Sequence, residues 1–173
     1  MMGLGISLSP VLLFGKVFYA KDEALKLAFP DADEVEMRTF ILKEDEVRRA
    51  QERARTRIDS RLFTFYVGKK KGNVVGYAAI DTHIVRTLPE TFMVVLSSEG
   101  EVLTTIILAF HEPLEYLPSE RWLEQFREKN LSPDLRVGRD IAGIAGSTLT
   151  TQAITQGIRK VLALFEILVK EKR

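Results

Sequence analysis

The sequence contains no cysteine, so it has no disulfide, iron–sulfur cluster, cysteine nucleophile or cysteine-ligated zinc. Histidine is scarce, with 2 residues in 173. Neither sign of charge is in excess, because 25 Lys and Arg face 24 Asp and Glu, for a net charge of +1. This balance excludes the basic surface of a dedicated nucleic-acid-binding protein, and we expect no nucleic-acid partner.

The remaining composition is that of an ordinary globular chain. Hydrophobic residues make up 46% of it and charged residues 28%. These values exclude wholesale disorder and a polytopic membrane protein. The length suits one domain with a sizeable core.

Residues 1–20 differ from this average. They are apolar apart from a few small polar residues, and Lys16 is their only charge. The length of the apolar run is typical of the hydrophobic part of a signal peptide or of a short anchor. We therefore expect residues 1–20 to be a signal peptide or N-terminal membrane anchor and residues 21–173 to form a single domain. The alternative is that residues 1–20 form a buried helix or strand of that domain.

The rest of the chain alternates between helical and strand patterns. Apolar residues at intervals of three and four predict helices, and alternation with tight turns predicts strands. The expected helices cover 22–29, 43–58, 120–129 and about 150–170, and the expected strands cover 35–41, 62–67, 74–80, 91–96 and 101–110. Because strands joined by tight turns pair antiparallel, we predict an α+β fold: an antiparallel sheet built from hairpins, packed with helices including a long C-terminal helix.

Residues suited to catalysis or metal binding are few. His83 and His111 each close or follow a predicted strand, and Glu112 is adjacent to the second of them. Two histidines and a carboxylate are a known metal-ligand set, so an enzyme around His83 and His111 is one alternative. The other interpretation is a pair of hydrogen-bonded histidines at a sheet edge.

An unusual segment precedes the last predicted helix. Gly143 and Gly146 permit close approach of the backbone. Four hydroxyl side chains then surround the helix start, from Ser147, Thr148, Thr150 and Thr151. Free N–H groups and the positive end of the helix dipole converge there, which favours a phosphate. The alternative is an ordinary Ser/Thr N-cap.

The heptapeptide Ala145–Thr151, AGSTLTT, resembles the flavinylation motif S-G-A-T-x-T-S. That motif belongs to the FMN-binding domain shared by one subunit of the sodium-pumping NADH:quinone reductase and one subunit of the Rnf electron-transport complex. The resemblance implies that a flavin transferase esterifies the FMN phosphate to Thr148. Gly146, Thr150 and Thr151 match the motif, whereas Ala145 and Ser147 stand where the family has Ser or Thr and Ala.

The resemblance extends upstream of the motif and covers about residues 92–163. The family has a hairpin, an E-T-P-G-L-G loop and an F-x-x-Q-F helix. In this sequence the predicted hairpin of 92–110 is followed by His111-Glu-Pro-Leu114 and then by Trp122-Leu-Glu-Gln-Phe126. The resemblance therefore implies that Glu112 belongs to the cofactor-binding loop.

Taken together, the resemblance implies an FMN-binding electron-transfer module that is exported or membrane-anchored. It would lie in the periplasm or on the outer face of the cytoplasmic membrane, with a flavin transferase and membrane redox proteins as partners. The N–H groups of Leu149, Thr150 and Thr151 are expected to hold the phosphate. No residue resembles a substrate acid or base, so we expect a redox carrier rather than an enzyme. A flavin-free exported interaction domain is the main alternative, supported by Ala145 and Ser147.

Overall fold

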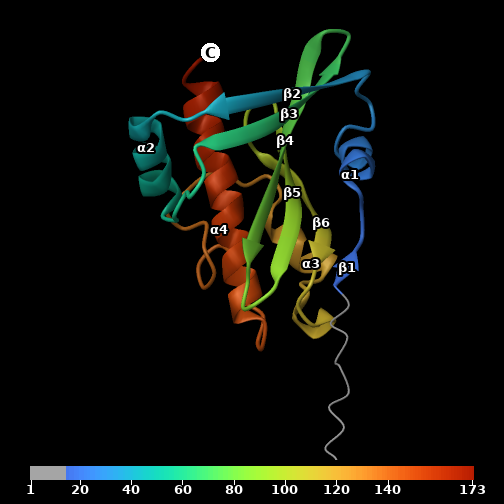
Figure 1. Ribbon diagram of the computed structural model, residues 1–173, viewed down its shortest axis with the longest axis vertical. Coiled ribbons are helices and arrows are strands. Elements are labelled where there is room, and N and C mark those ends of the chain that lie inside the picture. Colours follow the sequence, from blue (N-terminus) through green and yellow to red (C-terminus); the bar gives the residue numbers. More distant parts are fainter. Residues whose placement is uncertain (1–14) are drawn as a thin grey trace, which may run out of the picture.

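The computed structural model describes residues 15–173, which form one antiparallel sheet and its covering helices (Figure 1). The strands lie in the order β1-β6-β5-β4-β3-β2. This arrangement confirms the predicted α+β fold. The elements are β1 (Lys16–Val17), α1 (Lys21–Ala28), β2 (Glu34–Ile41), α2 (Glu44–Ala54), β3 (Leu62–Lys70), β4 (Asn73–Ile84), β5 (Pro89–Ser97), β6 (Val102–Phe110), η1 (Leu114–Tyr116), α3 (Glu120–Leu123), η2 (Glu124–Phe126), α4 (Thr148–Phe165) and the π-helical turn η3 (Glu166–Lys170).

The expected leader falls mostly on residues 1–14, which lie outside the described residues. Its last residues belong to the fold, because Lys16 and Val17 pair with Phe110 and Ala109 of β6. The N–H of Phe18 continues this pairing to the Leu108 carbonyl at 2.8 Å. Residues 15–173 include no helix with the length and apolarity needed to cross a membrane.

Two predicted helices were too long. The helix expected over 43–58 ends at Ala54, because Arg55 adopts a left-handed conformation with φ of 54°. The helix expected over 120–129 is the short α3 followed by the 3₁₀ turn η2. There the chain is drawn to the sheet, because the Glu128 N–H donates to the Val102 carbonyl and the Val102 N–H donates to the Lys129 carbonyl.

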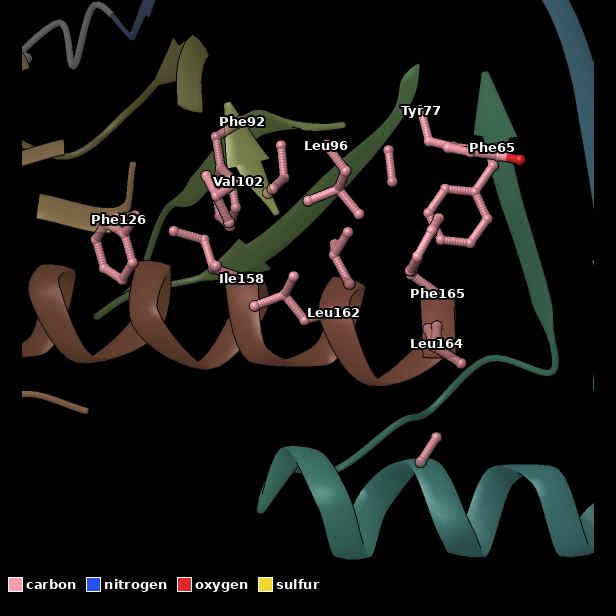
Figure 2. Packing of buried hydrophobic residues seen from close by; sticks show 14 of the residues in the cluster. Phe65, Tyr77, Phe92, Leu96, Val102, Phe126, Ile158, Leu162, Leu164 and Phe165 are labelled. Atoms are coloured by element: carbon pink, nitrogen blue, oxygen red, sulfur yellow. The ribbon is translucent and has the colours of Figure 1, made fainter. Parts of the chain in front are cut away.

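The main core lies between one face of the sheet and α4. The apolar stripe predicted for the last helix, which includes Ile154 and Ile158, is fully buried there. Figure 2 shows Phe92 and Leu96 of β5 pointing toward Ile158 and Leu162 of α4. The approach is close because Gly157 faces the sheet: a Cβ atom at Gly157 would lie 2.5 Å from Phe92 Cζ.

The other face of the sheet is only partly covered. A smaller core under α1 contains Ala24, Phe29, Met93 and Val95. Toward β2 and β3 the same sheet has exposed apolar side chains, namely Val35, Met37, Ile41 and Leu62.

Arg159 is a buried cation in the middle of α4, with 5% of its surface exposed. Its guanidinium donates to the carbonyls of Ala54 at 2.7 Å and Arg53 at 2.9 Å, at the end of α2. It also donates to the carbonyls of Ser132 at 2.6 Å and Leu135 at 3.0 Å. The C-terminal end of a helix carries partial negative charge, which favours a cation there. Arg159 therefore joins α4, α2 and the loop at 132–135.

Arg159→Met is expected to lower the free energy of unfolding by about 3 kcal/mol, because it leaves four carbonyls without this donor. Urea unfolding followed by circular dichroism measures the change. The matched control is Arg48→Met on the exposed face of α2, which we expect to change stability by less than about 0.5 kcal/mol. Equal losses in the two variants would contradict the role given to Arg159.

Candidate functional site

The AGSTLTT segment forms the turn into α4. Gly146 has φ of +85°, a conformation that residues with a side chain rarely adopt. A Cβ atom there would have no heavy atom within 4 Å, so the backbone angle and not crowding demands glycine. Ser147 is the N-cap residue, and Thr148 is the first residue of the helix.

The start of α4 has no side-chain cap. The Ser147 hydroxyl accepts no capping hydrogen bond, although Ser147 is the N-cap residue. Its carbonyl accepts from the N–H of Thr151 at 3.0 Å. Within residues 15–173, no acceptor is found for the N–H groups of Thr148, Leu149 and Thr150. The ordinary N-cap hydrogen bond considered from the sequence is therefore missing, and three N–H donors at the helix start remain available.

The site residues divide by exposure. Thr148 and Leu149 are exposed, as are Ala145 and Gly146 before them. In contrast, Ser147, Thr150 and Thr151 are buried. The Thr151 hydroxyl donates to the Thr148 carbonyl at 3.0 Å, so both hydrogen-bond donors of Thr151 serve the first helical turn. Thr148 is thus the exposed hydroxyl of the segment.

The loop before Gly143 is fixed by the short helix α3–η2. The Trp122 indole N–H donates to the Ala142 carbonyl at 2.6 Å, and the Ala142 N–H donates to Gln125 Oε1 at 2.8 Å. The Ser119 hydroxyl caps this helix by accepting from the Trp122 N–H. Trp122 and Gln125 of the W-L-E-Q-F motif therefore support the AGSTLTT segment by hydrogen bonding to the carbonyl and the N–H of Ala142.

Glu112 has a different neighbourhood. Its carboxylate is buried and accepts from the N–H groups of Arg86 at 3.1 Å, Thr87 at 2.8 Å and Leu88 at 3.0 Å. These hydrogen bonds, chiefly that from Thr87, lower the pKa of Glu112. Glu112 therefore holds the turn between β4 and β5.

A cluster of buried polar side chains lies under α4, and the sequence analysis did not predict it. His83 Nδ1 is 3.5 Å from Asp81 Oδ2, and His83 Nε2 is 3.6 Å from Glu90 Oε2. Asp81 also binds the ammonium group of Lys160 on α4. We call these four residues the His83 cluster.

The His83 cluster has strongly perturbed protonation. Burial alone lowers the pKa of His83, but the carboxylates of Asp81 and Glu90 outweigh it and raise this pKa to about 9. Burial raises the pKa of Glu90, which has no exposed side-chain surface. Burial opposes ionisation of Asp81 as well, but His83 and Lys160 lower its pKa.

The metal-site alternative requires His83, His111 and Glu112 to converge. His111 Nδ1 instead lies 3.1 Å from the Pro89 carbonyl, and His83 and Glu112 have the partners described above. Among residues 15–173, no three His, Asp or Glu side chains are placed to hold a metal ion. The structure therefore does not support this alternative.

Comparison with known proteins supports the resemblance predicted from the motif. No family model matches the chain. The chain is similar to the subunit designated G of the Na⁺-translocating ferredoxin:NAD⁺ oxidoreductase complex of Acetobacterium woodii, with 28% identity over 126 residues. The similarity covers 63% of this chain, which spans 58% of the length of that relative. The relative belongs to an Rnf electron-transfer complex, which agrees with a redox role.

Two structural features of the site were missed in the sequence. Arg159 lies between Ile158 of the apolar stripe and Lys160, and nothing in this spacing distinguishes it from an exposed cation. The alignment of His83 with Glu90 depends on the register between β4 and β5, which pairs these two residues directly. Sequence patterns give that register poorly.

Gln125→Met is expected to release the loop at Ala142, because it removes the acceptor of the Ala142 N–H. The Ala142 amide should then exchange with solvent at least about tenfold faster in hydrogen exchange measured by NMR, a change of about 1.4 kcal/mol in local opening. Gln152→Met, on the exposed side of α4, is the matched control. Unchanged exchange at Ala142 would show that Gln125 does not fix the loop.

The His83 cluster predicts a pH-dependent stability. Because the pKa of folded His83 is raised to about 9, its contribution is complete below the ordinary value of 6.5 and is lost as pH rises through 9. The stability difference between the natural chain and His83→Gln should therefore shrink by about 3 kcal/mol from about pH 6 to about pH 10. Urea unfolding at several pH values measures it, and a constant difference would contradict the assignment.

Proposed function

We propose that this chain is an FMN-binding electron-transfer module in which the flavin is attached through a phosphoester to Thr148. The observation that carries the proposal is the start of α4, where an exposed threonine hydroxyl lies beside N–H groups without an acceptor among the described residues. The similarity to a subunit of an Rnf complex supports the redox role.

The residues at the helix start fit a phosphate. The N–H groups of Leu149 and Thr150 are two of the three available donors, beside that of Thr148 itself, and the helix dipole adds partial positive charge. The Thr151 N–H, which the sequence also suggested, is already bound to the Ser147 carbonyl. We therefore assign phosphate contacts to Leu149 and Thr150, and support of the turn to Ser147 and Thr151.

The surroundings of Thr148 also fit a flat apolar ring. Leu149 is 49% exposed, and the small residues Ala145 and Gly146 before the helix are exposed as well. FMN supplies one- and two-electron chemistry when it is bound, and the protein holds and tunes it. The covalent bond prevents loss of the cofactor outside the cytoplasm, where we place the domain. Of the two roles expected for residues 1–20, we propose the retained membrane anchor, because Lys16 and Val17 pair with β6 and cleavage after residue 20 would remove this pairing.

The proposed partners follow from the same assignment. A flavin transferase forms the phosphoester, and redox proteins at the outer face of the cytoplasmic membrane or in the periplasm exchange electrons with the module. Glu112, which the resemblance assigns to the cofactor-binding loop, is proposed to hold the β4–β5 turn rather than to bind the flavin itself. A flavin-free interaction domain remains the second candidate, because Ala145 and Ser147 depart from the motif.

Thr148→Ala is expected to abolish covalent flavin, because it removes the exposed hydroxyl. Intact mass is measured after co-expression with a flavin transferase, and the natural chain should gain the mass of FMN less one water. Ser147→Ala and Thr150→Ala, which remove buried hydroxyls, should keep this gain. If the gain survives in Thr148→Ala and is lost in one of the controls, the acceptor is that other residue.

Gly146→Val is expected to reduce flavin loading by at least about tenfold, because a β-branched residue strongly disfavours the positive φ of Gly146. The flavin-free protein should lose only about 1–2 kcal/mol of stability, since the space around Gly146 is open. Gly138→Val is the control, because Gly138 also has positive φ and open space. Equal flavin loading in the Gly146→Val and Gly138→Val variants would contradict a specific role for Gly146.

A further inference from the structure

The outer edge of β6 lies open between two short stretches of pairing. β1 pairs with Ala109 and Phe110, and the N–H groups of Phe18 and Tyr19 donate to the Leu108 carbonyl. At the other end, Val102 is paired with the chain at 128–129. Between them, residues 103–107 have no backbone partner on this side within residues 15–173.

A groove of about 520 Å³ follows this open edge. We call it the β6 groove. One wall comes from the segment before α1 and from α1 itself, and the other comes from the loop at 117–118, α3 and η2. Figure 1 shows β6, α1, β1 and α3 on the same side of the molecule. Its apolar lining includes Phe18, Tyr19 and Leu27 on the first wall, Ile106 on β6, and Leu117 and Leu123 on the second wall.

The groove also contains polar groups with no partner of their own. The Thr105 hydroxyl is buried and has no hydrogen-bond partner among the described residues. Glu120 and Glu124 are exposed at the rim and form no ion pair with any described residue, and Arg127 is the single cation among the residues that line the groove. The rim therefore has an excess of negative charge.

The helical spacing of α3 and η2 connects the groove with the site. Glu120, Leu123 and Glu124 line the β6 groove, whereas Trp122 and Gln125 face the Ala142 peptide. A chain bound in the groove would therefore contact the same short helix that supports the turn before Thr148.

We propose that the β6 groove binds an extended segment of a partner protein, which pairs its backbone with residues 103–107 as an added strand. Open backbone groups select an extended chain, because addition to a sheet edge satisfies them. The apolar walls select apolar side chains at alternate positions, and the carboxylates of Glu120 and Glu124 select a Lys or Arg in the segment. This inference goes beyond the proposed flavin attachment and does not depend on it.

The test is a selection of random ten-residue peptides displayed on phage against the full chain. The enriched peptides are expected to alternate apolar residues and to carry Lys or Arg. The best peptide, made with a fluorescent label, should bind Leu27→Glu at least about tenfold more weakly, because a charge then lies in the apolar wall. Met37→Glu places the same charge at an exposed apolar position on β2 and should bind normally.

Two further measurements separate strand addition from other modes of binding. Amides within residues 103–107 should exchange with solvent at least about tenfold more slowly in the peptide complex. The double change Glu120→Gln and Glu124→Gln should weaken binding about fivefold at low salt and flatten its salt dependence, unlike Glu34→Gln on β2.

Several outcomes would overturn the proposal. Peptides that bind Leu27→Glu as well as the natural chain would show that they use another surface. Peptides that bind without slowing β6 exchange would exclude strand addition. A concentration-dependent dimer that Leu27→Glu abolishes, with no peptide selected, would assign the groove to a second copy. Every measurement is repeated on Thr148→Ala, which lacks the proposed flavin acceptor but keeps all groove residues. Peptide binding should be unchanged in this variant, so a failure of the flavin proposal and a failure of the groove proposal are seen separately.

Discussion

The burial of Arg159 is the constraint on which the arrangement around α4 depends. A guanidinium with 5% exposure and no carboxylate partner must be satisfied by carbonyl groups. These carbonyls come from the end of α2 and from the loop at 132–135, so both are held against α4. The chain between this loop and α4 is short, and it carries the AGSTLTT segment. The position of the turn at Gly146 therefore depends on the same contacts that stabilise the core.

The helix α4 serves both the core and the candidate site. Its apolar stripe packs on the sheet, and Gly157 permits the close approach at Phe92. At its start Thr148 is exposed, beside three available N–H groups. A short second anchor, from Trp122 and Gln125 to Ala142, limits the freedom of the preceding loop. A rigid helix start with a fixed loop is the kind of platform that holds a phosphate group in one place.

Local patterns in the sequence predicted most of the elements, and contacts distant in sequence decided the rest. The stripe from Ile154 and the two hairpins follow from spacing and turn chemistry, and the structure confirms them. The early end of α2 depends on Arg55 and on carbonyls bound by Arg159, about one hundred residues away. The His83 cluster depends on strand register, and the role of Glu112 depends on a turn that closes beside it. The exposed position of Thr148 agrees with the motif, although the flavin bond itself stays a prediction.

The most direct test of the flavin assignment is the absorption spectrum of the chain purified after co-expression with a flavin transferase and then precipitated with acid. The account predicts that the flavin absorption remains with the precipitated protein, because a phosphoester survives loss of the fold. Flavin released into the supernatant would contradict the covalent bond. A colourless protein before precipitation would contradict the FMN-binding function as a whole.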